Sequence, residues 1–106
     1  MKGEKGRTFD LYDLVSQIPK DSYWVDFLKV RRMEAGVLSL KPGEKDTQTP
    51  HDSDELYYVT QGSGVVKVGN EDMPVRAGSV IFIPAHVPHH FYGNKDTLTV
   101  LYVFSE

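Results

Sequence analysis

The four histidines of this chain lie within one stretch of sequence, and a glutamate follows the first of them. The residues are His51, His86, His89 and His90, with the glutamate at Glu55. Two imidazoles and one carboxylate that share a face form a ligand set suited to Fe(II), Mn(II) and similar divalent ions. A single histidine is more often structural than ligating, so a metal site is predicted only if the fold brings these residues together.

Strand periodicity indicates which of these side chains can meet. Alternate residues of an extended chain share a face, so His51, Glu55 and Tyr57 point the same way if the segment is extended. His89 and His90 begin a later predicted strand, and only one of two neighbours can face inward. Neighbouring strands lie about 4.8 Å apart, close enough for their side chains to share an ion. We therefore expect His89 to reach His51 and Glu55 from a neighbouring strand.

Residues 44–55 are acidic, and two interpretations of this stretch stay open. The acidic residues are Glu44, Asp46, Asp52, Asp54 and Glu55. A run of this kind is usually a solvated loop. The alternative is that some of these carboxylates surround a cation; Asp54 differs in parity from Glu55 and should face outward.

The pattern of apolar residues predicts one short helix followed by an all-β domain. Apolar residues spaced i, i+3, i+4 and i+7 predict an amphipathic helix over residues 9–18, with Asp10 as its N-cap and Pro19 ending it. From residue 23 onward, short strands alternate with Gly and Pro turns, which is typical of an antiparallel sandwich or barrel. The predicted strands cover residues 23–33, 35–40, 55–60, 65–68, 73–76, 79–83, 89–92 and 98–104.

Length and composition exclude several classes of protein. A chain of 106 residues is expected to form a single domain over residues 1–106, with a barrel at 23–104 and a flexible N-terminus at 1–8. It contains no cysteine, which excludes disulfides, zinc ribbons and thiol nucleophiles. A net charge of −3 argues against a nucleic-acid partner. Without a membrane-length apolar run or a signal-peptide pattern, we expect no membrane partner and a cytoplasmic location.

Two spaced motifs resemble those of the cupin superfamily, over residues 43–94. The first motif reads Gly, five residues, His-any-His, three or four residues, Glu, six residues, Gly; it is similar to the positions Gly43, Thr49, His51, Glu55 and Gly62. The second is similar to the spacing of Gly78, Pro84 and His89. The resemblance implies a small single-domain cupin, a double-stranded β-helix (jelly-roll) barrel.

The resemblance also implies a cofactor, one divalent metal ion (Fe, Mn, Zn or Ni) held by His51, Glu55 and His89. The chain departs from the family at Thr49, which stands where the first motif histidine is usual and whose hydroxyl is a poor ligand. Gln48, next to it, offers a side-chain carbonyl oxygen as a fourth contact. Three protein ligands leave coordination positions open for catalysis or ligand binding.

Several other residues could belong either to the site or to the core and surface of the barrel. Tyr57 is the best single candidate for a wall of a ligand pocket, although core packing is the default for an aromatic residue on a strand. His86, which stands where the second motif usually has glycine, is expected at the surface, and His90 is expected to point away from the site. Arg31 and Arg32 either hold an acidic substrate or lie on a solvated strand edge.

Three functions are compatible with this interpretation. The first is a metal-dependent enzyme that acts on a small molecule, such as an oxygenase or isomerase. The second is a non-catalytic module that binds a sugar or organic acid. The third is a structural domain with inert histidines. A homodimer is also expected. The resemblance implies it, because small cupins often pair, and the segment Tyr23-Trp24-Val25 has no obvious partner within so small a barrel.

Overall fold

The computed structural model describes residues 5–105, which form one helix followed by eight strands. The helix is α1 (Leu11–Ser16). The strands are β1 (Trp24–Val30), β2 (Met33–Leu40), β3 (Glu55–Gln61), β4 (Ser63–Val68), β5 (Glu71–Arg76), β6 (Val80–Ile83), β7 (His89–Tyr92) and β8 (Leu98–Ser105). The predicted strand at 23–33 is wrong at its end, because a turn after Val30 separates β1 from β2.

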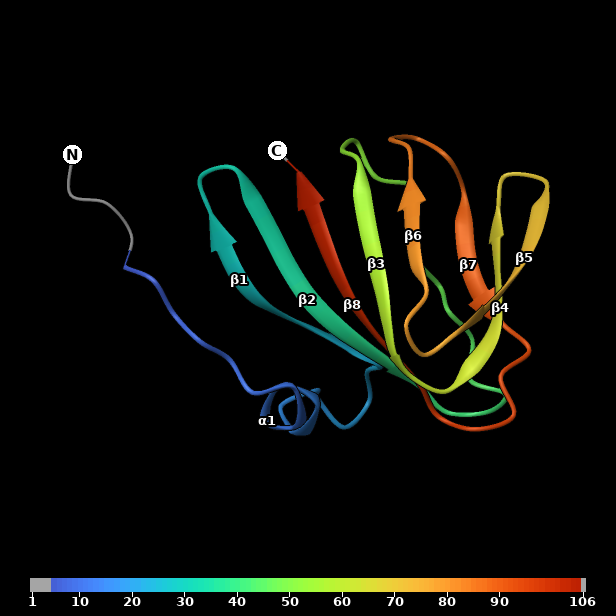
Figure 1. Cartoon of the computed structure of the whole chain (residues 1–106), viewed down its shortest axis with the longest axis horizontal. Helices are drawn as coiled ribbons and strands as arrows, with labels where there is room; N and C mark the ends of the chain where they lie inside the picture. The colour runs from blue at the N-terminus through green and yellow to red at the C-terminus, as the bar shows by residue number, and fades with distance from the viewer. Residues whose placement is uncertain (1–4, 106) are drawn as a thin grey trace.

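The helix begins and ends close to the predicted residues. The side chain of Asp10 accepts a hydrogen bond from the Asp13 backbone N–H at 3.1 Å, which satisfies one of the free donors of the first turn. The helix is shorter than predicted, six residues, and lies outside the barrel at one end, against β1 and β2 (Figure 1). Phe9, before the helix, packs its ring 4.7 Å from that of Phe27 on β1.

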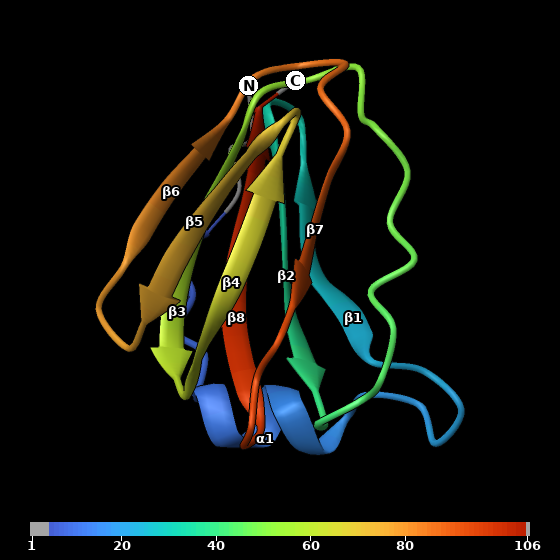
Figure 2. The same cartoon turned by 90° about the vertical axis from the view of Figure 1, so that its right-hand side faces the viewer.

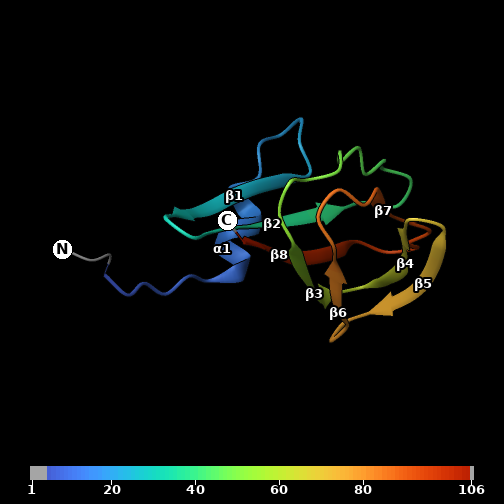
Figure 3. The ribbon, with the colours of Figure 1, turned by 90° about the horizontal axis from the view of Figure 1, so that it is seen from above.

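Two antiparallel sheets face each other and enclose the core. The larger sheet has the order β1-β2-β8-β3-β6 and the smaller one the order β5-β4-β7 (Figure 1). Seen from above, the two sheets close around the core at the end that contains β3, β6, β5, β4 and β7 (Figure 3). Strand β1 lies away from that end, beside β2 (Figure 3). The predicted all-β jelly-roll barrel is confirmed. Its core includes Leu38, Val66, Phe91 and Val100, each no more than 1% exposed.

Strand β3 carries the inward face that the sequence predicted. Glu55, Tyr57 and Val59 are buried, and Leu56 and Tyr58 between them are exposed. Residues 41–54, however, form no strand and run as a long loop along one side of the barrel (Figure 2). The prediction that His51 shares a strand face with Glu55 is therefore wrong.

Strand β7, which begins with His89, also differs from expectation. It belongs to the smaller sheet and pairs with β4, whereas β3 belongs to the larger sheet. His89 and Glu55 therefore approach each other across the interior and not along one sheet. The spacing of hydrogen-bonded neighbouring strands, on which the sequence prediction relied, therefore does not describe the approach of these two residues.

The N-terminal segment is only partly described. Residues 1–4 of the predicted flexible N-terminus lie outside the described residues, and residues 5–8 are exposed and have no regular secondary structure. Within residues 5–105, no helix is long and apolar enough to cross a membrane.

Candidate metal centre and its pocket

Three side chains from separate parts of the chain converge inside the barrel. His51 comes from the loop 41–54, Glu55 from the start of β3 and His89 from the start of β7, and one potential ligand atom of each lies within 4.8 Å of the others. Nε2 of His89 lies 3.2 Å from Oε1 of Glu55, and Nε2 of His51 lies 3.9 Å from the same oxygen. The structure brings together the three residues that the sequence singled out. We call them the ligand trio.

Four buried polar atoms of the ligand trio lack hydrogen-bond partners among the described residues. They are Nε2 of His51, both carboxylate oxygens of Glu55 and Nε2 of His89. A buried polar group left unpaired costs about 1–3 kcal/mol, and more if it is charged. Four such atoms around one point form the arrangement that a bound cation would satisfy.

The ring of His89 is held in the orientation that coordination requires. Its Nδ1 lies 2.8 Å from the backbone oxygen of Val87. Because a carbonyl oxygen can only accept, Nδ1 carries the hydrogen and the lone pair of the neutral ring lies on Nε2, toward Glu55. Burial by itself would lower the pKa of His89, but the neighbouring Glu55 carboxylate and the Val87 carbonyl outweigh it and raise that pKa.

His51 is positioned by contacts of its loop. Its backbone oxygen accepts a hydrogen bond of 2.7 Å from the backbone N–H of His86, and its ring packs edge-on against Phe104 at 4.4 Å. His86 has a φ of 69°, the left-handed region, which explains physically why glycine suits this position. The His86 ring itself is 74% exposed, as expected, and lies near Asp52.

Gln48 and Tyr57 form a pair beside the ligand trio. The Tyr57 hydroxyl donates to Oε1 of Gln48 at 2.7 Å, and Nε2 of Gln48 donates to Asp46 at 2.8 Å. Tyr57 is completely buried, and burial raises its pKa well above the usual value, so the hydroxyl stays a donor. Tyr57 is not among the residues that line the pocket described below, and its contact with a ligand stays a prediction. Coordination by Gln48 stays a prediction. Its Oε1 already accepts one hydrogen bond, from Tyr57, and has one lone pair left for an ion.

Asp46 is a site residue that the sequence did not distinguish from the other loop acids. Its carboxylate accepts hydrogen bonds from the Tyr23 hydroxyl at 3.0 Å and from the Phe91 backbone N–H at 2.8 Å, besides the one from Gln48. It therefore ties the loop to β7 and to the start of β1. Of the acidic residues at 44–55, only Glu55 belongs to the ligand trio. Asp46 therefore belongs to the loop and not to the ligand trio, and its carboxylate is bound by protein groups that are partly buried.

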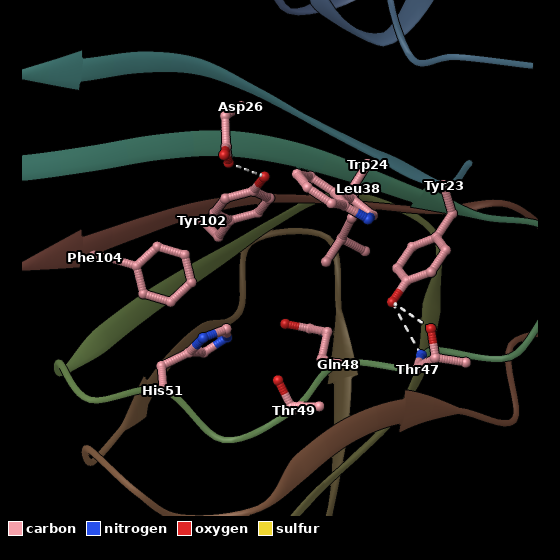
Figure 4. Close-up of a pocket in the computed structure, with 10 residues that line it drawn as sticks. All are labelled: Tyr23, Trp24, Asp26, Leu38, Thr47, Gln48, Thr49, His51, Tyr102 and Phe104. Atoms are coloured by element: carbon pink, nitrogen blue, oxygen red, sulfur yellow. Dashed lines mark hydrogen bonds between the residues drawn. The ribbon is translucent and has the colours of Figure 1, made fainter. Parts of the chain in front are cut away.

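A pocket of about 290 Å³ opens beside His51 (Figure 4). One wall is largely aromatic and comes from β1, β2, β8 and the residue before β1; the opposite wall is the loop at residues 47–51. The lining residues are Tyr23, Trp24, Asp26, Leu38, Thr47, Gln48, Thr49, His51, Tyr102 and Phe104. None of these described lining residues is lysine or arginine. Arg32 does not line this pocket but a second hollow, which also includes Glu55 and shares Phe104 with the first. Its role as an anchor for an acidic substrate stays a prediction.

One end of the pocket is built by three residues in a row across three strands. Asp26 on β1 lies opposite Gly36 on β2, which in turn lies opposite Tyr102 on β8. The Tyr102 hydroxyl passes over Gly36 and donates to Asp26 at 2.5 Å. A Cβ at Gly36 would lie 2.1 Å from the Tyr102 hydroxyl oxygen, so only glycine leaves room for this contact.

Replacing Gly36 by alanine is expected to displace Tyr102 and to break its hydrogen bond to Asp26. Overpacking of this kind lowers the free energy of unfolding by about 1–3 kcal/mol. Urea denaturation measures the change, with Gly6→Ala as the control because nothing lies within 4 Å of that position. Equal stability of Gly36→Ala and the unmodified chain would contradict the tight fit.

Comparisons with known proteins agree with this architecture. The sequence profile of a family described as "Cupin domain" matches residues 36–105. An uncharacterized protein of Streptomyces coelicolor is 41% identical over 80% of this chain and 81% of its own length. Mannose-6-phosphate isomerase 2 of Arabidopsis thaliana is 28% identical over 76% of this chain but only 16% of its own length. The crystal structure of TT1209 from Thermus thermophilus has a TM-score of 0.79 at 27% identity and covers 92% of this chain and 95% of that one.

Proposed function

The chain belongs to the cupin family, and from this premise we propose that it binds one divalent transition-metal ion and uses it to act on a small molecule. The observation that carries the proposal is the ligand trio His51, Glu55 and His89, whose buried ligand atoms converge without partners among the described residues. An N/N/O ligand set of this type suits Fe, Mn, Zn or Ni. The pocket is lined by His51, the member of the ligand trio through which a small molecule in it would approach the ion.

An enzyme of the oxygenase or isomerase type is the function we favour. When bound, the ion would supply Lewis-acid polarisation or a place for O2. The protein residues position the small molecule and exclude water: the loop at residues 47–51 presents the polar groups of Gln48 and Thr49, and the aromatic wall covers the opposite side (Figure 4). The similarity to mannose-6-phosphate isomerase 2 supports an isomerase only weakly, because it covers a small part of that protein.

A non-catalytic binding module is the second candidate, and one observation favours it. Thr49 stands where the first cupin motif usually has histidine, and its hydroxyl is a poor ligand for these ions. Three protein ligands bind a metal less firmly than four. A metal that only anchors a sugar or an organic acid would then be sufficient.

Turnover by the metal-loaded protein separates the two candidates. Oxygen consumption and product formation are measured across a panel of small molecules, with His89→Ala as the inactive variant and His90→Ala as its matched control. Metal-dependent turnover supports the enzyme. Saturable binding without turnover supports the binding module, and failure to hold any metal contradicts both.

An apolar patch on the outside of the larger sheet offers a surface for a second copy of the chain. Leu56 on β3 lies opposite Phe82 on β6, and Tyr58 lies opposite Val80. All four side chains are exposed, by 45–66%. β6 ends its sheet, so the patch lies at a strand edge where another chain can pair. By contrast, Tyr23 is hydrogen-bonded to Asp46, which corrects the expectation that the segment 23–25 lacks partners.

We expect a homodimer, with a mass in light scattering twice the 12.0 kDa of the chain. Phe82→Glu should give a monomer, because two buried carboxylates would face each other across the contact. Tyr12→Glu is the matched control, since Tyr12 is 80% exposed on the helix, away from the patch. A monomeric mass of the unmodified chain at micromolar concentration would contradict the prediction.

A further inference from the structure

We propose that the end of the pocket formed by Asp26, Tyr102 and Trp24 binds a cationic group of the organic ammonium class. The ligand would be a small molecule whose cationic group lies at this end, here called the Asp26 end, and whose oxygen atoms reach the ligand trio. The contact between the ligand's oxygen atoms and the ligand trio rests on the function proposed above. The Asp26 end itself needs no metal.

Hydrogen-bond polarity carries the first step. The Tyr102 hydroxyl donates a hydrogen bond to Asp26, so the remaining lone pairs of both groups are acceptors. Burial, and then the neighbouring Asp26 carboxylate, raise the pKa of Tyr102, so the phenol keeps its proton and stays the donor of this hydrogen bond. No lysine or arginine is present among the described residues that line the pocket. The Asp26 end therefore favours a donor or a cation over an anion.

Aromatic rings carry the second step. Trp24, Tyr102 and Phe104 line the same side of the pocket as Asp26 (Figure 4). Ring faces attract ammonium groups through their quadrupole, tryptophan most strongly, and a set of such rings is a recognised way of holding a quaternary ammonium. Trp24 is 46% exposed at this position, which leaves part of its ring free to contact a ligand.

The geometry is held in place before a ligand arrives. Gly36 lets the Tyr102 ring cross β2, and the hydrogen bond then fixes Asp26 next to it. A carboxylate held by a buried tyrosine contributes its charge without having to be reoriented by the ligand. Because these residues lie on three strands of one sheet, the arrangement does not depend on the loop that carries His51.

The chain provides its own reporter for this inference, since Trp24 is the single tryptophan. The metal is removed with a chelator, and Trp24 fluorescence is titrated with choline and with 3,3-dimethylbutan-1-ol, its neutral isostere of nearly equal shape, at constant pH and ionic strength. Cation–π attraction together with the Asp26 charge should make choline bind about 5- to 30-fold more tightly than the neutral isostere.

The variant Asp26→Asn tests the charge alone, because an asparagine oxygen can still accept from Tyr102. Choline should lose most of its advantage, and the affinity for the neutral isostere should stay unchanged. Asp72→Asn is the matched control: Asp72 also accepts a hydrogen bond from a tyrosine, Tyr92, at 2.9 Å, but it lies outside the pocket. Its choline affinity should equal that of the unmodified chain.

Three results would overturn the inference. They are equal affinity for choline and its neutral isostere, tighter binding of the anion 3,3-dimethylbutanoate by the metal-free protein, and absence of any choline-specific fluorescence change up to about 100 mM. Each is separable from the function proposed above, which is tested by metal content. A chain that holds metal but does not bind choline refutes the cationic subsite alone. A chain that binds choline but holds no metal under any supplement refutes the metal site alone.

Discussion

Replacing His51 or His89 by alanine is expected to remove most of the metal that we propose the protein binds. Each change deletes one of the three ligands whose atoms lie within 4.8 Å of one another. The loss of affinity should exceed the roughly 10- to 100-fold caused by changes outside the ligand shell. Elemental analysis of protein purified with and without supplemented Fe, Mn, Zn or Ni measures the bound metal.

His86→Ala and His90→Ala are the matched controls, because they remove an imidazole from the same stretch of sequence without touching the ligand trio. The His86 side chain is exposed, and His90 stacks near Tyr92 on β7. Both variants should keep their metal, and circular dichroism should show the same strand content in all four. Equal loss in His86→Ala and His51→Ala would place the site elsewhere. A chain that holds no metal under any supplement would show that the histidines are structural.

Metal binding is expected to stabilise the fold strongly. Free metal at 1,000 times its dissociation constant adds about 4 kcal/mol to the free energy of unfolding. For a domain of this size that corresponds to a rise of roughly 15–30 °C in the thermal midpoint. The physical reason is that the unpaired buried atoms of Glu55, His51 and His89 gain a partner. Thermal unfolding followed by circular dichroism measures the shift, and His89→Ala should abolish it.

The stabilisation by metal should depend on pH, with a sign that follows from His89. Its pKa is raised in the folded chain, so the contact between protonated His89 and Glu55 stabilises the metal-free protein below the unfolded value near 6.5. That contribution is lost as the pH rises through the raised pKa. The metal needs neutral imidazole, so its effect should be largest at alkaline pH and should vanish as His89 protonates. An increment that does not change across this range would contradict coordination by histidine.

The strand pattern and the motif residues could be predicted from the sequence because their signals are local. Asp10 caps a helix one residue later, and the alternation of Glu55, Tyr57 and Val59 needs only the two-residue period of a strand. Gly and Pro turns divide the chain into strands without reference to any distant residue. Motif spacing added His51 and His89, whose convergence with Glu55 the structure then displayed.

The path by which these residues meet was decided by the tertiary structure. His51 reaches the ligand trio from a loop and not from a strand, because the loop is held by long-range hydrogen bonds that no local pattern encodes. One joins His86 to the His51 backbone, and another joins Asp46 to Phe91. Asp46 is one of several acidic residues in the same loop, so the sequence offered no reason to distinguish it from its solvated neighbours.

The residues around the pocket also divide into those that the sequence could predict and those that only the tertiary structure brings together. By itself, the sequence determined an all-β barrel and three residues suited to a metal ion. Tyr57, its candidate for the pocket wall, is completely buried and hydrogen-bonded to Gln48, so its contact with a ligand stays a prediction. Asp26 and Tyr102 are 76 residues apart and meet only because β2, with Gly36 at the crossing point, lies between their strands. Strand order in the sheet decides such contacts, and strand order is a property of the packed chain that residue spacing does not contain.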